Sequence, residues 1–246
     1  MNPIILIPAR LGSTRLPGKP LADICGLPMI VHVLNRAREA GLGPVAVACA
    51  ETDIAEVVHA HGGTAILTNP ALPSGSDRIF AALQTLDPYG QHDVIINLPG
   101  DLPGIDPGFL TAVCQPLQNP VYDIATLVAP ITSAAEAEAA SVVKCACAFG
   151  PDAEVAPALY FSRAKIPSGE GALWHHIGVY AYRRASLAAF VSLPESPLEQ
   201  REKLEQLRAL EAGMRIGVVR VAHAPFGVDT PADLDHARKI LEPKNA

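Results

Sequence analysis

The most constraining feature of this chain is a regular alternation between short, continuous apolar runs and longer segments of helical character. The apolar runs predict strands at 3–8, 45–50, 64–68, 93–98, 122–130, 142–149, 175–183 and 215–222. The longer segments predict helices at 28–41, 53–61, 76–87, 107–117, 133–139, 184–192, 197–212 and 231–241. Apolar strands separated by helices are typical of a largely parallel sheet covered on both faces. The sequence therefore predicts a three-layer α/β fold.

Several helix ends carry recognisable capping residues. Ser196 and Glu199 stand in capping-box order around a proline, and Thr230 and Asp233 have a similar layout. Gly213 occurs where a left-handed helix end is expected. These residues predict helices that begin at Pro197 and Pro231, and one that ends before Gly213.

The bulk composition indicates an ordinary globular protein. A chain of 246 residues can bury a substantial core, and 49% hydrophobic with 18% charged residues argues against disorder. No apolar run approaches the roughly 20 residues of a membrane span, and the N-terminus lacks the charged start of a signal peptide. We therefore expect one domain over 1–246, located in the cytoplasm and without membrane contact.

Cysteine and histidine usage gives no sign of a disulfide or metal framework. The five cysteines are odd in number, and Cys145 and Cys147 alternate along a predicted strand, which indicates packing on one face. The eight histidines show no metal-ligand spacing. A net charge of −6, without stripes of basic and aromatic residues, argues against nucleic-acid binding.

A cationic loop follows the first predicted strand, in the segment PIILIPARLGSTRLPGKP at 3–20. Arg10, Arg15 and Lys19 concentrate positive charge in an otherwise acidic chain, which indicates a polyphosphate-binding loop at the edge of a sheet. The chain has neither a P-loop motif nor a G-x-G-x-x-G motif. The cationic side chains must therefore contribute more to phosphate binding than backbone N–H groups alone. A solvated charged loop is the alternative, but the loop's glycines and prolines and the preceding apolar strand argue against it.

Two aspartates are expected near this loop, because ligands of parallel α/β sheets bind at the carboxyl ends of the strands. Asp101 follows the strand in VIINLPGDLPGIDP, and Asp229 precedes a helix in FGVDTPADLDHAR. Two carboxylates beside a phosphate loop suit Mg²⁺, which completes its shell with phosphate oxygens and water. Each aspartate could instead serve a turn or cap a helix. That alternative is weaker for Asp101, since no helix follows it directly, and stronger for Asp229.

The motif P-A-R-x-x-S-T-R-L-P-G-K-P resembles the signature of the sugar-acid cytidylyltransferases, which activate acidic sugars as CMP derivatives. The adjoining PMIVHVLNRA is most similar to the 3-deoxy-manno-octulosonate (Kdo) cytidylyltransferase family. Further matches follow in the family's order: PSGSDRI at 73–79, the G-D-x-P element at 100–103, YFSR at 160–163, HIGVYAYR at 176–183, SPLEQREKLEQLR at 196–208 and GVDTPADL at 227–234. The resemblance covers essentially the whole chain. It implies a Rossmann-like nucleotidyltransferase fold with a mixed, mostly parallel sheet.

The resemblance also implies roles for individual residues. Lys19, Asp101 and Asp229 would be catalytic, and both aspartates would bind Mg²⁺. The nucleotide contacts would be Ala9, Arg10, Gly12, Ser13, Arg15, Lys19, Ser74, Gly75, Pro99 and Gly100. The sugar-acid contacts would be Arg78, which would pair with the carboxylate, and His176, Tyr180, Glu205 and Gln206. Without the resemblance, Arg78 could be an exposed helical arginine, and His176 and Tyr180 unremarkable residues on one strand face.

Three features depart from the family's pattern. Where the family reads N-x-Q-G-D-E-P, this chain has Pro99 in place of the glutamine and Leu102 in place of the glutamate. Proline offers neither a side-chain donor nor a backbone N–H, so either the site tolerates the loss or substrate preference has changed. The link between Ile166 and His175 is also short.

These expectations combine into one function. CTP and Kdo would give CMP-Kdo and pyrophosphate for bacterial lipopolysaccharide biosynthesis, in a Mg²⁺-dependent homodimer whose region 157–212 forms the sugar pocket and dimer contact. No Ser–His–Asp or Cys–His arrangement is evident, so no covalent intermediate is expected. The alternatives are another sugar acid, such as an amino-substituted octulosonate or a sialic acid, and a nucleotide-binding regulator without catalysis.

Overall fold

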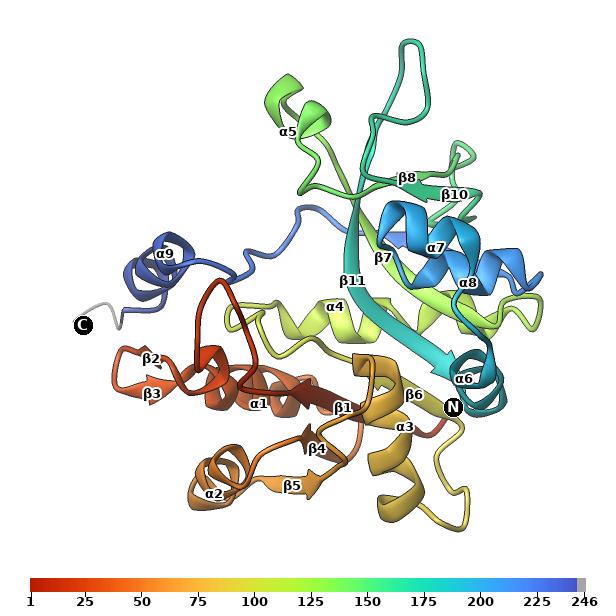
Figure 1. Cartoon of the computed structure of the whole chain (residues 1–246). Helices are drawn as coiled ribbons and strands as arrows, with labels where there is room; N and C mark the ends of the chain where they lie inside the picture. The colour runs from red at the N-terminus through yellow and green to blue at the C-terminus, as the bar shows by residue number, and fades with distance from the viewer. Residues whose placement is uncertain (243–246) are drawn as a thin grey trace. The chain divides into compact units, whose positions relative to one another are not determined.

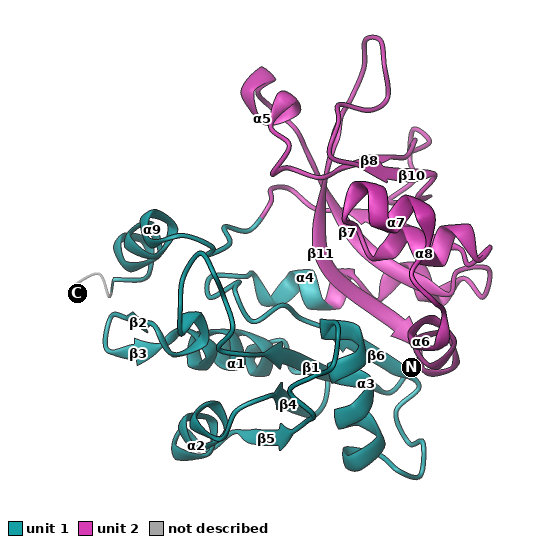
Figure 2. Cartoon of the chain, in the orientation of Figure 1, with its two compact units in different colours: residues 1–110, 225–246 teal, residues 111–224 magenta. Residues whose placement is uncertain are grey.

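The structure is a computed structural model that describes residues 1–242, and the chain separates into two compact units (Figure 2). Unit 1 combines residues 1–110 with the C-terminal segment from Pro225, and unit 2 spans residues 111–224. The expected sugar-pocket region 157–212 falls inside unit 2. The assignment of the whole chain to a single domain stays a prediction.

Unit 1 is built on a parallel sheet with strand order β5-β4-β1-β6 (Figure 1). Its strands are β1 (Pro3–Ala9), β4 (Val45–Cys49), β5 (Thr64–Leu67) and β6 (Val94–Asn97). The chain moves outward from β1 through β4 to β5 and then returns to the other side of β1 as β6. The strand order therefore reverses between β1 and β6, and the loops that leave their carboxyl ends border the expected ligand crevice.

Helices cover the sheet of unit 1, and a smaller apolar cluster anchors the C-terminal segment. The helical elements are η1 (Lys19–Leu21), α1 (Met29–Glu39), α2 (Thr52–Ala60), α3 (Gly75–Leu86), α4 (Pro107–Ala112, at the unit boundary) and α9 (Pro231–Leu241). A hairpin of β2 (Asp23–Ile24) and β3 (Leu27–Pro28) precedes α1. Ile24 and Met29 pack with Val228 and Leu234, and Leu16 lies against this cluster. This packing fixes the chain beside Lys19 and Asp229.

Unit 2 contains a mixed sheet. Its strands are β7 (Ile124–Pro130), β8 (Lys144–Ala146), β9 (Val155–Pro157), β10 (Tyr160–Ser162), β11 (Trp174–Arg183) and β12 (Ile216–Arg220). β7 pairs in parallel with β12 and antiparallel with β11, while β8 pairs antiparallel with β10 and β11. The helical elements are η2 (Gln115–Gln118), α5 (Ala134–Glu138), α6 (Arg184–Ser192), α7 (Pro197–Glu202) and α8 (Gln206–Glu211). The predicted α/β fold with a mixed sheet and helices on both sides is confirmed.

Two predicted helices are wrong in extent. The helix expected at 107–117 ends at Ala112, and the 3-10 turn η2 follows, because Pro116 has no N–H with which to continue an α-helix. The helix expected at 197–212 is divided at Lys203, whose φ of 57° is left-handed. The short strands β9 and β10 were not predicted. The capping boxes at Ser196 and Thr230 are confirmed.

Two further sequence expectations can be compared with the described residues. All five cysteines are free thiols, as expected. Within residues 1–242, none of the helices combines the length and apolar character that a membrane crossing requires.

Candidate active site

The cationic loop after β1 has a defined conformation at its base. The Leu11 carbonyl accepts hydrogen bonds from the N–H of Ser13 at 2.7 Å and of Gly18 at 3.4 Å, and the Leu11 N–H donates to Glu51 at 3.1 Å. Gly18 has a φ of 68°, the left-handed region that glycine adopts without strain. Lys19 follows directly and opens η1. The turn therefore projects the loop's cations from a fixed base.

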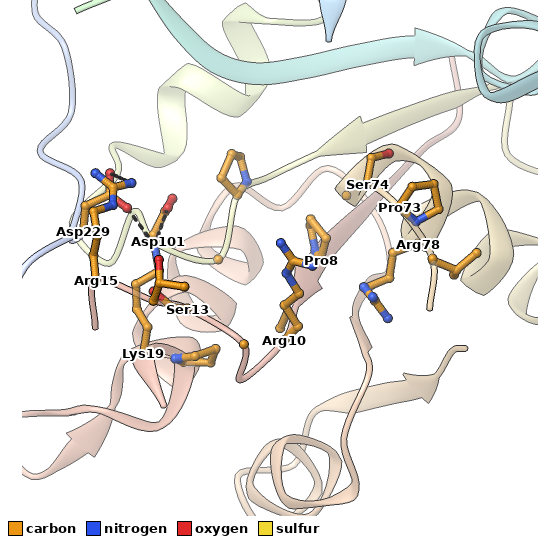
Figure 3. A pocket seen from close by; sticks show the side chains of 18 residues that line it. Pro8, Arg10, Ser13, Arg15, Lys19, Pro73, Ser74, Arg78, Asp101 and Asp229 are labelled. Atoms are coloured by element: carbon orange, nitrogen blue, oxygen red, sulfur yellow. Dashed lines mark hydrogen bonds and ion pairs between the residues drawn. The ribbon is translucent and has the colours of Figure 1, made fainter. Parts of the chain in front are cut away.

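Lys19 joins the two predicted aspartates (Figure 3). Its ammonium nitrogen lies 2.8 Å from Asp101 Oδ2 and 3.0 Å from Asp229 Oδ1. Arg15 adds a contact of 3.1 Å to the other oxygen of Asp229. Residues more than 200 positions apart in the chain thus meet beside the loops that follow β1 and β6.

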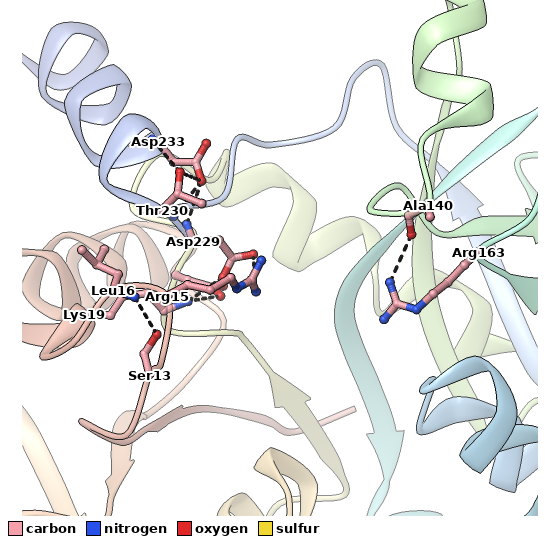
Figure 4. A network of polar contacts seen from close by, with 10 residues as sticks. Ser13, Arg15, Leu16, Lys19, Ala140, Arg163, Asp229, Thr230 and Asp233 are labelled. Carbon is pink, nitrogen blue, oxygen red and sulfur yellow. Dashed lines mark hydrogen bonds and ion pairs between the residues drawn. The ribbon is translucent and has the colours of Figure 1, made fainter.

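Backbone contacts explain why the aspartates converge. The Val228 N–H donates to the Asp101 carbonyl at 2.9 Å, so the two loops run against each other. Gly104 permits this approach, because a Cβ there would lie 2.4 Å from the Phe226 ring. Thr230 caps α9 and exchanges hydrogen bonds with Asp233 (Figure 4). The carboxylate of Asp229 is therefore not the helix cap.

Electrostatics keep Lys19 charged. Burial alone would lower the pKa of Lys19, but the carboxylates of Asp101 and Asp229 outweigh burial, and its pKa is raised above the ordinary value. Because the two carboxylates converge on one cationic centre, their donor set also fits Mg²⁺, which takes one or two carboxylates and completes its shell with phosphate and water. Among residues 1–242, no group of three or more His, Cys, Asp or Glu side chains could hold a metal ion. A metal here would complete its shell with oxygens from phosphate and water.

These residues line a pocket of about 380 Å³ in unit 1. All the residues expected to contact nucleotide lie on its wall: Ala9, Arg10, Gly12, Ser13, Arg15, Lys19, Ser74, Gly75, Pro99 and Gly100. Ser74 caps α3 by accepting the Asp77 N–H at 3.1 Å, so the positive end of this helix meets the pocket. A Cβ at Gly100 would lie 3.1 Å from the Pro8 carbonyl, so a larger residue would crowd the wall.

Arg78 lies in the same pocket and is only 2% exposed, so the alternative of an exposed helical arginine is wrong. Its guanidinium donates to Thr68 Oγ1 at 2.6 Å and to the Asn69 carbonyl at 3.3 Å. Burial lowers the pKa of Arg78, Glu51 raises it, and the nearby charge of Arg10 lowers it further. Arg10 and Arg78 therefore place two positive charges in one pocket, where an anion would relieve their repulsion.

The other predicted sugar-acid residues gather in unit 2. The ring centroids of His176 and Tyr180 lie 5.5 Å apart, and Phe161 packs edge-on against His176 at 4.8 Å. Burial raises the pKa of Tyr180, and the neighbouring charges of Tyr182 and Glu205 raise it further. The structure thus brings His176 and Tyr180 together in one aromatic cluster with Phe161.

Some polar side chains of the helical motif at 196–208 bond to each other, whereas the amide nitrogen of Gln206, within residues 1–242, does not. Glu199 accepts the Ser196 N–H and pairs with Arg208 through two hydrogen bonds of 2.8 and 2.6 Å. These residues hold α7 and α8 together. Gln206, in contrast, has its Nε2 buried without a hydrogen-bond partner among the described residues. That amide could donate to a bound ligand.

The break between α7 and α8 is held from a neighbouring strand. Glu202 accepts from Ser162 Oγ at 2.7 Å and from the Arg163 N–H at 3.0 Å. The Arg163 guanidinium donates in return to the carbonyls of Glu202 and Lys203, and to Ala140 as Figure 4 shows. These contacts satisfy carbonyls that the helix end leaves free, and they fix the position of the residues that follow the break.

The chain is similar over nearly its whole length to known cytidylyltransferases. A family model described as cytidylyltransferase matches residues 4–216. The 3-deoxy-manno-octulosonate cytidylyltransferase of Paramagnetospirillum magneticum is 57% identical over 98% of this chain and 98% of its own, and that of Rhodospirillum centenum is 58% identical over 99% and 95%. This chain belongs to the 3-deoxy-manno-octulosonate cytidylyltransferase family. A solved CMP-2-keto-3-deoxy-manno-octonic acid synthetase, in complex with CTP, superposes with a TM-score of 0.89 at 42% identity, covering 98% of each chain.

The sequence analysis of this cytidylyltransferase did not identify three residues whose side chains hydrogen-bond the cationic loop, His176 or the helix break. They are Glu51, Thr126 and Glu202. Glu51 follows β4 at the same edge of the sheet as the predicted aspartates, so the rule that located them could have located it as well. Nothing in the sequence distinguishes Thr126 and Glu202, because a threonine inside a strand and a glutamate inside a charged helix are common. Thr14, Leu72 and Pro73 also line the pocket and were not predicted.

Proposed function

We propose that this chain transfers a cytidylyl group from CTP to Kdo, giving CMP-Kdo and pyrophosphate. The observation that carries the proposal is the Lys19 ammonium bound by Asp101 and Asp229 at the mouth of a cation-lined pocket. Membership of the family supports the choice of CTP and of the sugar acid.

The positively charged residues of unit 1 would bind the triphosphate of CTP. CTP carries about four negative charges, and a chain with a net charge of −6 can hold it only where cations are concentrated. Arg10, Arg15 and Lys19 would hold the triphosphate, with the N-terminal end of α3 beside them. The anomeric hydroxyl of Kdo would attack the α-phosphorus in line, losing its proton as the P–O bond forms and pyrophosphate leaves. Positioning and charge stabilisation account for the rate.

We further propose dependence on Mg²⁺, with Asp101 and Asp229 as its protein ligands. When bound, the ion would supply neutralisation of phosphate charge and acidification of the attacking hydroxyl. Lys19 would then be released from the carboxylates to contact phosphate. The convergence of the two carboxylates at one point of the pocket supports this assignment.

For Kdo itself we propose His176, Tyr180, Glu205 and Gln206 as contacts, with Arg78 as partner of the carboxylate. The buried, unpartnered amide of Gln206 supports a polar ligand at this place in unit 2. The buried guanidinium of Arg78 supports an anion in the pocket of unit 1. The substitution of Pro99 for glutamine removes one possible ligand contact, and the remaining polar groups would carry recognition.

We also propose a cytoplasmic homodimer whose product serves lipopolysaccharide biosynthesis. Region 157–212 of unit 2 is where the resemblance to the family places the dimer contact. Light scattering on the purified protein measures the oligomeric state, and a monomer at micromolar concentration would contradict the homodimer.

The deciding experiment measures pyrophosphate release with each of the four ribonucleoside triphosphates, with and without Kdo. We expect release only with CTP and Kdo together, and only with Mg²⁺ present. A panel containing a sialic acid and an amino-substituted octulosonate tests the preferred acid. CTP binding without release for any acid would instead indicate a regulator.

A further inference from the structure

Thr126 on β7 is completely buried, and its hydroxyl has three polar neighbours in unit 2. Its Oγ1 lies 2.8 Å from the Val179 carbonyl, 3.0 Å from the Ile177 carbonyl and 3.1 Å from Nε2 of His176. No sequence motif points to this residue. Its surroundings determine what the neighbouring histidine can do.

The two carbonyls reach Thr126 because β11 is irregular opposite it. Ile177 pairs with Leu127, whereas the next partner pair is Tyr180 with Thr126, so β11 carries two extra residues. Two extra residues preserve the alternation of side chains, which keeps His176 and Tyr180 on one face. The displaced carbonyls of β11 then turn toward the Thr126 hydroxyl.

Counting protons assigns the direction of each hydrogen bond. A hydroxyl has one proton, and a carbonyl can only accept. Oxygen atoms 2.8 Å apart need a proton between them, so the Thr126 proton points to the carbonyls. Toward His176 the Thr126 oxygen can therefore only accept, and Nε2 must carry the hydrogen. A neutral ring with its hydrogen on Nε2 has an unprotonated Nδ1, which is an acceptor.

The ring of His176 is both neutral and fixed in place. Burial, and to a smaller degree the neighbouring His175, lower the pKa of His176 to about 3. Phe161 and Tyr180 pack around the imidazole. None of the described residues forms a hydrogen bond with Nδ1, so this acceptor is left for a ligand.

We propose that Thr126 is a positioning residue that holds His176 in the Nε2–H tautomer, so that Nδ1 accepts a hydrogen bond from a hydroxyl of the sugar acid. This inference rests on the proposed function for its ligand, although the tautomer follows from the chain alone. An acceptor nitrogen recognises a hydroxyl and cannot bind a carboxylate. His176 therefore selects for a hydrogen-bond donor, such as a hydroxyl, at one position of the sugar, and the carboxylate must find its partner elsewhere.

The tautomer is measured by two-bond ¹H–¹⁵N correlation spectra of protein labelled in its histidines, with His176→Gln to assign the signal. We expect a pyrrole-like shift for Nε2 and a pyridine-like shift for Nδ1 near neutral pH, and a change at Nδ1 when Kdo is added. The opposite tautomer, or an imidazolium, would overturn the proposal even if the enzyme is active. The expected tautomer in a protein that does not turn over Kdo would instead refute the proposed function alone.

Kinetics then test whether the tautomer matters. Thr126→Val removes the acceptor and should raise KM for Kdo about three- to tenfold, the loss of one neutral hydrogen bond, with KM for CTP unchanged. Thr126→Ser keeps the hydroxyl and should restore both the spectrum and KM. Ser186→Ala removes another buried hydroxyl of unit 2 and should change neither. Equal increases in both KM values would refute the positioning role, and if Thr126→Val does not fold, the wild-type and Thr126→Ser spectra decide.

Discussion

Replacing Lys19 by methionine tests the centre of the proposed phosphate site. Methionine keeps most of the side-chain length and removes only the ammonium. The Lys19 side chain is 16% exposed, so solvent screens its charge only in part. A hydrogen bond to a charged group contributes about 1.5–3 kcal/mol. At 1.4 kcal/mol for each factor of ten, CTP should bind about 10–150-fold more weakly.

Isothermal titration with CTP in magnesium buffer measures this loss directly. KM for Kdo should change less than twofold at saturating CTP, because Lys19 lies in the nucleotide pocket. Lys165→Met is the matched control, since Lys165 is a half-exposed lysine of unit 2 that pairs with Glu138 at 3.3 Å. Unchanged CTP affinity in Lys19→Met, or equal losses for both substrates, would refute a triphosphate contact.

Three further predictions concern the metal ligands, the helix pair and the altered loop. Asp101→Ala should abolish pyrophosphate release while circular dichroism and melting temperature stay close to wild type; near-normal turnover would exclude a metal role for Asp101. Glu199→Gln leaves the buried guanidinium of Arg208 without its carboxylate and should lower the free energy of unfolding by about 3–5 kcal/mol, measured by urea denaturation. Burial raises the pKa of Glu199, but Arg208 and the Ser196 N–H outweigh burial and lower it. The carboxylate therefore stabilises the fold above its unfolded pKa of about 4.3, and this stabilisation is lost as pH falls through the lower folded pKa. The difference between wild type and Glu199→Gln should shrink below about pH 4, and a difference that does not depend on pH would contradict the ion pair. Pro99→Gln should leave kcat intact and lower KM for CTP or Kdo, and a collapse in rate would show that the pocket has adapted to proline.

Sequence periodicity predicted the sheet of unit 1 because its strands are continuous and mostly apolar. β1, β4, β5 and β6 all appear within a residue or two of their expected bounds. The convergence of Asp101 and Asp229 on Lys19 was also predictable. Asp101 follows the carboxyl end of β6, where ligands of parallel sheets bind, and the resemblance to the family paired Asp229 with it.

Other features depend on tertiary contacts that periodicity does not report. Lys203 breaks a segment with good helix formers on both sides, and the break is stabilised by Arg163, which lies forty positions earlier in the chain. β9 and β10 have three residues each, too few to show alternation. The orientation of His176 depends on a hydroxyl fifty residues away in the chain. None of these could be predicted from local sequence.

The composition of unit 1 from two distant segments has a consequence for synthesis on the ribosome. Lys19 and Asp101 emerge early, whereas Asp229 emerges only after all of unit 2 has been translated. A nascent chain that stops before residue 225 can form the parallel strands, yet it lacks one carboxylate of the pair. Such products should therefore be inert toward CTP turnover, and the enzyme becomes competent only after Asp229 has been translated and has joined unit 1.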